Sequence, residues 1–193
     1  KTNKLSFITF TEFFCADDRF CSLPSENFGF TKRSNKVLYA ISSKKFLPGH
    51  KKRLELKKNV LNSPLFSELK FSINPVKDLL DVYRNFKFVI VIENCDEENY
   101  TSEKFYDVIK SGAIPIYHKR KHHNFIYPYL SFDEIVYPDK ILNEIKLFSE
   151  KYSLEEISNE NFNQLIVMRE NLLIEHFKYL AYPHEAKDCV HTK

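Results

Sequence analysis

The order of hydrophobic and polar residues predicts strands and helices that alternate along most of the chain. Residues 86–92 form a nearly continuous apolar run, which is typical of a strand buried in a sheet. A polar loop follows, and helical periodicity then covers residues 102–110. Gly112 is expected to end this helix, and residues 113–117 form the next apolar strand. The segment is therefore predicted to be a strand, a polar loop, a helix and a second strand.

Similar elements are expected on both sides of this segment. Apolar or periodic runs predict strands at residues 37–43 and 71–73 and helices at residues 50–61, 75–83, 139–152 and 161–180. Pro48-Gly49 is expected to form a turn before the first of these helices. Strands separated by helices favour parallel pairing, so strands 37–43, 88–92 and 113–117 should share one sheet. The sequence thus predicts an α/β fold with a doubly wound parallel sheet.

The polar loop would lie at the carboxyl end of a strand, where open α/β sheets bind ligands. The helix after it begins with Ser102, Glu103 and Lys104. Glu103 suits the partial positive charge of a helix N-terminus, whereas Lys104 there should cost about 0.3 kcal/mol or somewhat more. An anion bound over the first N–H groups would reverse this cost, which favours a phosphate site. The alternative is a solvated lysine on an ordinary helix.

Composition places the chain among globular proteins and leaves its ligand open. Hydrophobic residues make up 43% and aromatic residues 15% of the 193 positions, enough for one core with an appendage. The net charge of +3 fits an anionic ligand but does not require nucleic acid or an anionic membrane. No apolar run approaches the ~20 residues that span a bilayer, and no signal peptide opens the chain. Because the first residue is Lys1 rather than Met, we expect a processed or trimmed segment.

Histidines and cysteines are present without the spacing of a metal site. The run His118–His123 is basic but has no carboxylate nearby, so a solvated loop is favoured over a metal site or a nucleic-acid patch. A disulfide between the first two cysteines stays open, although free thiols are favoured. The four cysteines are Cys15, Cys21, Cys95 and Cys189.

The central segment resembles the donor-sugar motif of the α-1,3/4-fucosyltransferases, glycosyltransferase family 10. The matching residues are Glu93-Asn94, Tyr100, Glu103, Lys104 and Ile114-Pro115-Ile116-Tyr117. Ser102 stands where threonine is usual, which keeps the hydroxyl, and Thr101 replaces an apolar residue. Weaker similarity extends from about Ser6 to Leu180, so the resemblance covers most of the chain.

This resemblance implies an inverting transfer of L-fucose from GDP-β-L-fucose to a glycan hydroxyl. Such enzymes have two Rossmann-like domains in a GT-B-type arrangement, with the donor in the C-terminal domain. The acceptor and the general-base carboxylate belong mainly to the N-terminal domain. About 36 residues precede the donor domain here, too few for that second domain. The chain is therefore expected to be the donor-binding half of a fucosyltransferase and to lack the general base.

The resemblance assigns the donor diphosphate to Arg53 and Lys104, which are the expected catalytic charges. Arginine can grip phosphate oxygens with two donors, and lysine acts as a point charge. Both would stabilise the negative charge of the leaving group. Two alternatives for Arg53 stay open: Lys52 could take its role, or Arg53 could be one more solvated charge of a basic run.

Glu103 is the third catalytic candidate that the resemblance implies. It would accept hydrogen bonds from hydroxyls of the ribose or fucose, and its alternative is to complement the helix dipole. Tyr100, Asn94 and Ser102 complete the expected donor site. Tyr100 would contact the donor or anchor the loop, and Asn94 would touch the nucleotide or bond the loop backbone. For Glu93, the alternative to a role in the donor site is that it is buried as the partner of a core arginine or lysine.

The expected organisation is an N-terminal extension or interdomain remnant at residues 1–36, a GDP-fucose-binding domain at 37–182 and a tail at 183–193. The expected partners are GDP-fucose and a glycan acceptor, with no metal, no other cofactor and no nucleic acid. The oligomeric state stays open, and membrane association would need segments beyond this chain. A glycan on the sequon Asn99-Tyr100-Thr101 would block the donor loop. This favours a bacterial or viral cytoplasmic protein, with or without peripheral membrane association, over a Golgi enzyme fragment.

Two functions other than fucosyl transfer by this chain stay open. A nucleotide-sugar-binding domain without turnover would use the same donor residues. A transferase for another nucleoside-diphosphate sugar would use them too, because contacts to the diphosphate do not specify the sugar.

Overall fold

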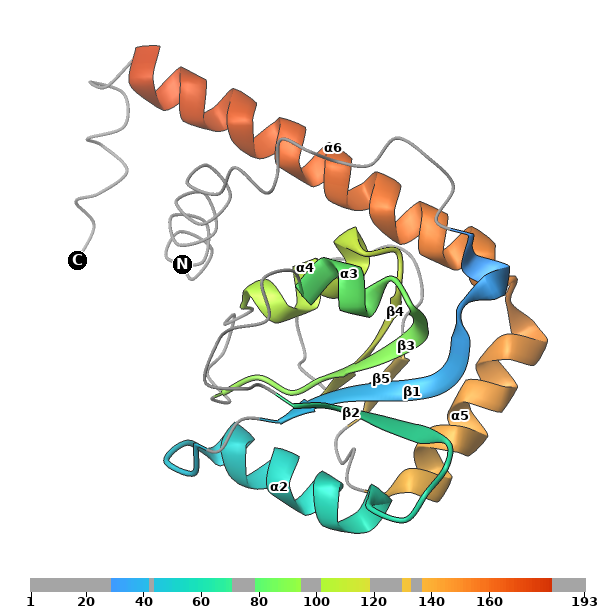
Figure 1. The fold of residues 1–193 in the computed structure, drawn as a ribbon. Helices are drawn as coiled ribbons and strands as arrows, with labels where there is room; N and C mark the ends of the chain where they lie inside the picture. The colour runs from blue at the N-terminus through green and yellow to red at the C-terminus, as the bar shows by residue number, and fades with distance from the viewer. Residues whose placement is uncertain are drawn as a thin grey trace. The chain divides into compact units, whose positions relative to one another are not determined.

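The structure is a computed structural model that describes residues 29–41, 44–70, 79–94, 102–118, 130–132 and 137–181, without the side chains at 70, 103, 131, 132 and 168–181. Within these ranges, five strands form one sheet in the order β2-β1-β3-β4-β5 (Figure 1). The strands are β1 (Ser34–Ile41), β2 (Phe66–Lys70), β3 (Phe86–Val91), β4 (Ile114–His118) and β5 (Leu130–Phe132). Every neighbouring pair is parallel, and β1, β3 and β4 are the three predicted strands. The prediction of a Rossmann-like parallel sheet is therefore confirmed.

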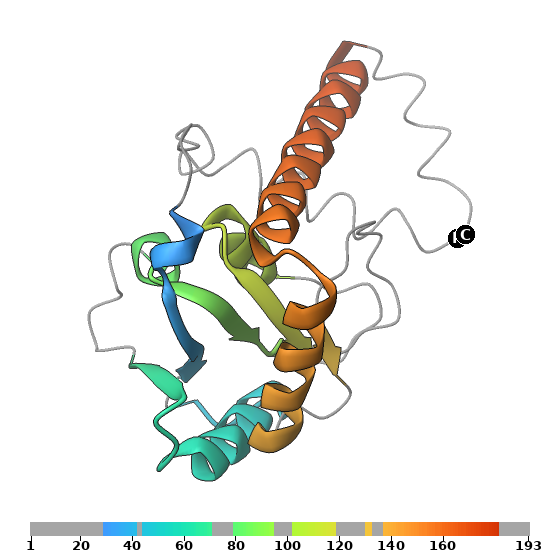
Figure 2. The same ribbon diagram turned by 90° about the vertical axis from the view of Figure 1, so that its right-hand side faces the viewer.

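Helices cover both faces of this sheet. The chain moves from β1 to β2 in one direction and from β3 to β4 in the other. Right-handed crossovers in opposite directions place their helices on opposite faces. Accordingly, α2 (Pro48–Val60) and α5 (Pro138–Lys151) contact each other on one face, and α3 (Leu79–Tyr83) and α4 (Glu103–Lys110) on the other (Figure 1, Figure 2). The order reverses between β1 and β3, so the crevice at their carboxyl ends is where this fold binds ligands.

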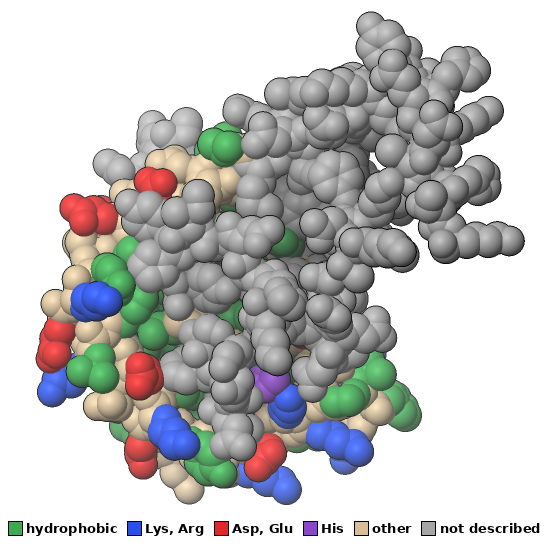
Figure 3. Space-filling view, turned by 180° about the vertical axis from the view of Figure 1, so that it is seen from behind, with side chains coloured by type: hydrophobic (Ala, Val, Ile, Leu, Met, Phe, Trp, Pro, Cys, Tyr) green, Lys and Arg blue, Asp and Glu red, His purple; other side chains and the backbone are tan. Residues whose placement is uncertain are grey.

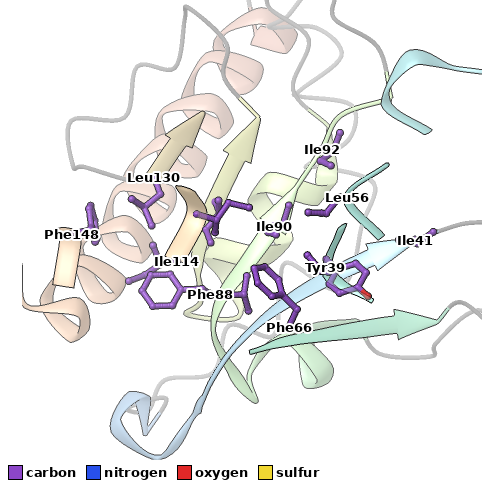
Figure 4. Packing of buried hydrophobic residues seen from close by; sticks show 14 of the residues in the cluster. Tyr39, Ile41, Leu56, Phe66, Phe88, Ile90, Ile92, Ile114, Leu130 and Phe148 are labelled. Carbon is purple, nitrogen blue, oxygen red and sulfur yellow. The ribbon is translucent and has the colours of Figure 1, made fainter. Parts of the chain in front are cut away.

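Alternate residues of the central strands form the core under α2 and α5. They pack with Leu56 of α2 and with Ile141 and Phe148 of α5 (Figure 4). The strand residues in this cluster are Val37, Tyr39, Ile41, Phe66, Phe88, Ile90, Ile92, Ile114, Ile116 and Leu130. On the opposite face, Phe105 of α4 packs edge-on against Tyr117, with ring centroids 4.9 Å apart. Burial on both faces explains why most residues of β3 and β4 are apolar, rather than every second residue.

Several element boundaries differ from those predicted. α2 begins at Pro48, so Pro48-Gly49 is the first turn of the helix and not a turn before it; proline is tolerated there because the first N–H groups have no partner in the helix. α6 (Leu154–Ala181) begins earlier than residue 161. β2 and β5 were not predicted: β2 is the polar sequence FSELK, and β5 has three residues. Both gain their strand conformation from pairing with a neighbour. The predicted strand 71–73 and the first part of the predicted helix 75–83 lie outside the described residues.

The chain divides into two compact units, Ser25–Phe162 and a second unit of Lys1–Pro24 with Asn163–Lys193. The sheet belongs to the first unit. The domain boundaries at residues 36 and 182 stay a prediction. Among the described helices, none has the length and apolar character that a membrane span requires.

Candidate functional site

The start of α2 lies directly against the end of β3. The Gly49 N–H donates to the Asn94 carbonyl at 3.1 Å. A Cβ on Gly49 would lie 1.6 Å from the Glu93 carbonyl oxygen, a distance that no side chain can adopt. The absence of a side chain at residue 49 is therefore what allows the helix N-terminus to reach the strand end at the β1/β3 crevice.

Glu93 and Ser102 fix the start of α4 over the same strand end. Ser102 is the N-cap, and its Oγ accepts a hydrogen bond from the Lys104 N–H at 3.4 Å. The buried Glu93 carboxylate accepts from the Ser102 N–H at 2.9 Å and from the Ser102 hydroxyl at 2.5 Å. It also accepts from the Tyr117 hydroxyl at 3.3 Å. Glu93 is thus buried, and its hydrogen-bond partners within the described ranges are the helix cap Ser102 and Tyr117 of β4 rather than a core arginine or lysine.

Arg53 and Lys104 are each held by a polar neighbour. The half-buried Arg53 donates from Nε to the Gly49 carbonyl at 3.2 Å and from Nη2 to the Asn94 side-chain oxygen. The Lys104 ammonium donates to the Ser102 Oγ at 3.0 Å. These contacts orient one guanidinium and one ammonium at the carboxyl end of β3.

His50 adds a third basic group to this cluster. Its buried ring accepts a hydrogen bond at Nδ1 from the Leu47 N–H at 3.2 Å, so the neutral ring carries its proton on Nε2. Burial lowers the pKa of His50, and the nearby charges of Arg53, Lys44 and Lys104 lower it further. Sequence reasoning did not single out this residue. A histidine three positions into a helix could have indicated a capping side chain, but not its cationic neighbours.

A cavity of about 180 Å³ opens beside these cations. Arg53 of α2 and Lys104 of α4 line it, together with the aromatic side chains of Tyr39 and Tyr83 and the carboxylate of Asp107. Its other lining residues are apolar: Ala40, Leu56, Leu79, Ile90, Val91 and Ile92. The cavity therefore combines an apolar wall with a cationic edge, which suits a ligand with an aromatic part and an anionic part.

Several predicted site residues can now be located. Arg53 and Lys104 meet at the cavity, and Asn94 and Ser102 contact them. Lys52, the alternative to Arg53, is not among the cavity residues. Tyr100 and the side chain of Glu103 lie outside what the structure describes. All the donor-binding and catalytic roles stay predictions, because the contacts above are between protein groups.

Two observations on the described part of the chain concern metal ions and surface charge. No group of three or more His, Cys, Asp or Glu side chains there could hold a metal ion. Acidic and basic side chains are interspersed over the lower part of the face seen in Figure 3, so the described surface there is not uniformly basic. All four cysteines, the sequon and residues 119–123 lie outside the described ranges.

Comparison with known families identifies the chain. Residues 31–149 match the family described as glycosyltransferase family 10 (fucosyltransferase), C-terminal. The chain belongs to glycosyltransferase family 10. The match covers more than half of the 193 residues and includes every strand of the sheet and both cations of the cavity. No curated protein matches the chain by sequence. Family 10 membership indicates a glycosyltransferase that transfers fucose, with a nucleotide-sugar donor and a glycan acceptor in general.

Proposed function

We propose that this chain binds GDP-β-L-fucose at the carboxyl ends of β1 and β3 and supplies the donor site of an inverting fucosyltransferase. The convergence of Arg53 and Lys104 on one cavity at this crevice carries the proposal. Family 10 membership supports the sugar, and the two cations support a diphosphate. The apolar wall of the cavity, with Tyr39 and Tyr83, would accommodate the nucleoside.

The chemistry requires stabilisation of a leaving diphosphate. An acceptor hydroxyl attacks the anomeric carbon while the bond from that carbon to the phosphate oxygen breaks, so GDP leaves with added negative charge. Arg53 and Lys104 would stabilise this charge as it develops. Asn94 and Ser102 hold the two cations before a donor arrives, so little reorientation is needed during the reaction.

Further donor contacts are proposed for residues whose side chains the structure does not describe. Glu103 would accept hydrogen bonds from hydroxyls of the ribose or fucose, and Tyr100 would pack against the donor. The general base and most of the acceptor site would come from a second domain in a GT-B-type arrangement. No metal is proposed, because arginine and lysine would supply the charge that a divalent cation supplies in other transferases.

Two alternative functions would use the same site. A nucleotide-sugar-binding domain would bind the donor without hydrolysis or transfer. A transferase for another sugar would bind GDP or another nucleoside diphosphate but show no preference for GDP-fucose. Calorimetry with GDP-fucose, GDP-mannose and UDP-glucose, together with hydrolysis and transfer assays, separates these functions.

The central test is the dependence of binding on phosphate. Lys104→Ala and Arg53→Ala should each weaken GDP binding by about 1–3 kcal/mol, the scale of a charge-assisted hydrogen bond. Binding of guanosine should barely change, because it lacks the phosphates. Lys58→Ala, which removes an exposed cation from the same helix, is the matched control. Equal losses for guanosine and GDP would indicate damage to the fold, and a wild-type chain that binds no GDP would reject the proposal.

A further inference from the structure

A second basic contact lies one strand farther along the same edge of the sheet. The Lys52 ammonium lies 2.8 Å from His118 Nε2. His118 is the last residue of β4 and is 8% exposed, and Lys52 is half-buried on α2. An ammonium can only donate, so the contact requires a neutral His118 ring that accepts at Nε2.

Two adjacent residues of α2 therefore reach the ends of two adjacent strands. Arg53 bonds Asn94 just after β3, whereas Lys52 bonds His118 at the end of β4. β3 and β4 are paired in register through Val91 and Tyr117, and paired strands lie about 4.8 Å apart. The cationic edge of the cavity thus continues from β3 to β4.

The position of Lys52 relative to the cavity indicates which part of a ligand it would meet. Residues of β1 and β3 line the cavity, whereas Lys52 contacts the end of β4, the strand next to β3. A nucleoside diphosphate whose nucleoside occupies the cavity would direct its second phosphoryl group toward β4.

A purely structural link between α2 and β4 does not need a cation. Elsewhere α2 packs on the sheet through apolar residues such as Leu56 and Val60. Lys52 instead places an ammonium directly beside Arg53 on α2, so an anionic ligand there would meet two cations of the same helix.

We propose that Lys52 binds the second phosphoryl group of the donor and that His118 is the positioning residue that holds Lys52 over the end of β4. This inference rests on the proposed function, since it names a further ligand of the same diphosphate. In this arrangement Lys52 would lie next to the bond that breaks. Arg53 and Lys104 would contact the diphosphate at the cavity.

The test compares guanosine, GMP and GDP as calorimetric ligands of the 193-residue chain. Lys52→Gln keeps a side-chain donor for His118 but removes the charge. It should weaken GDP binding about tenfold, as expected for a lost charge-assisted contact, and leave GMP and guanosine within about twofold. Lys51→Ala, an exposed cation of the same turn, is the control and should leave all three affinities within about twofold.

Variants of His118 test the positioning role. His118→Gln retains an acceptor for Lys52 and should keep most of the GDP affinity, whereas His118→Leu should lose a large part of it. Adding His118→Leu to Lys52→Gln should cause little further loss, because without the ammonium His118 has no phosphate-binding cation left to position. An independent, additive loss would overturn the positioning role.

The outcomes separate this inference from the proposed function. If GDP binding depends on Arg53 and Lys104 but not on Lys52, the inference is wrong and the proposed function stands. Equal weakening of guanosine, GMP and GDP by Lys52→Gln, or the same loss with Lys51→Ala, would also overturn the inference. If the wild-type chain binds guanosine as tightly as GDP, the diphosphate site itself is rejected.

Discussion

At the scale of single residues, His50 both caps the first turn of α2 and lies near the cations of the candidate site. Its neutral ring caps the helix through the Leu47 N–H, and burial and three nearby cations oppose its protonation. The same side chain therefore favours an unprotonated state in the free protein. The consequence is a link between pH and stability that involves the first turn of α2.

We predict that His50 makes the free protein less stable in mild acid. Its pKa is lower in the folded state than the ordinary value of about 6.5, so the unfolded state binds more protons as the pH falls through that value. Its contribution is fully present above that pH and is lost as the pH falls toward the lowered folded-state pKa. His50→Gln keeps an acceptor at the third helical position but does not titrate. Urea unfolding between pH 8 and 5 should therefore lose less stability in His50→Gln than in wild type. Parallel pH profiles for the two proteins would contradict this prediction.

A second residue-scale prediction concerns the carboxylate that holds the start of α4. Glu93→Gln removes the negative charge and replaces one acceptor oxygen by a donor amide, so the side chain can no longer accept from both the N–H and the hydroxyl of Ser102. We expect a loss of about 1–3 kcal/mol in the free energy of unfolding, because the group is buried. Tyr117→Phe removes a single longer hydrogen bond and should cost about 0.5–1.5 kcal/mol. A Glu93→Gln protein as stable as wild type would show that these contacts contribute little.

At the scale of elements, the site depends on how closely α2 approaches β3. Gly49 allows its helix to contact the backbone of Glu93, and Arg53 follows one turn later on the same helix. Displacing the first turn of α2 would therefore move the guanidinium away from Lys104. Helix placement and the proposed phosphate binding are thus coupled through one residue.

Gly49→Ala should reduce stability by about 3 kcal/mol or more, because the new Cβ meets a carbonyl that belongs to a buried strand end. Gly29→Ala is the matched control. Gly29 has a φ of 52° but no atom within 4 Å of an added Cβ, so only backbone strain of about 1 kcal/mol is expected. Chemical denaturation of both variants tests the comparison. If both substitutions lower the free energy of unfolding equally, the loss at Gly49 comes from backbone preference and not from collision of the new Cβ with Glu93.

At the scale of the whole molecule, ligand binding should appear as added stability. A ligand that binds the native state alone raises the free energy of unfolding by about 2.7 kcal/mol at a hundred times its Kd. The proposed donor site lies within the unit Ser25–Phe162, so the ligand would stabilise the unit that contains the sheet. This effect provides a readout that does not require an acceptor or a second domain.

We predict that saturating GDP-fucose raises the Tm of the wild-type chain and raises it less in Glu103→Gln. The substitution should cost the free protein only ~0.3–1 kcal/mol if the carboxylate complements the helix dipole. A contact with donor hydroxyls adds a further loss in the complex. The Tm shift should be the same with Mg²⁺ and with EDTA, since protein cations would bind the phosphates. An unchanged ligand-induced shift in Glu103→Gln would leave the residue with the dipole role alone.

The central β3–α4–β4 segment, its position in a parallel sheet and the family could be predicted from the sequence. The apolar runs of β3 and β4 are determined by burial on both faces, and Ser102 begins α4 through its own hydroxyl. These signals are local, because each arises from neighbouring residues in the chain.

Other features depend on contacts between distant residues, and the tertiary structure alone decides them. The polar β2 is a strand because β1 pairs with it, and Gly49 matters because Glu93 lies against it. The neighbours of His50 and the contact between Lys52 and His118 come from separate elements of the sheet and its helices. No pattern along the chain encodes these distances. They follow from the order of the strands, which brings the start of α2 to the ends of β3 and β4.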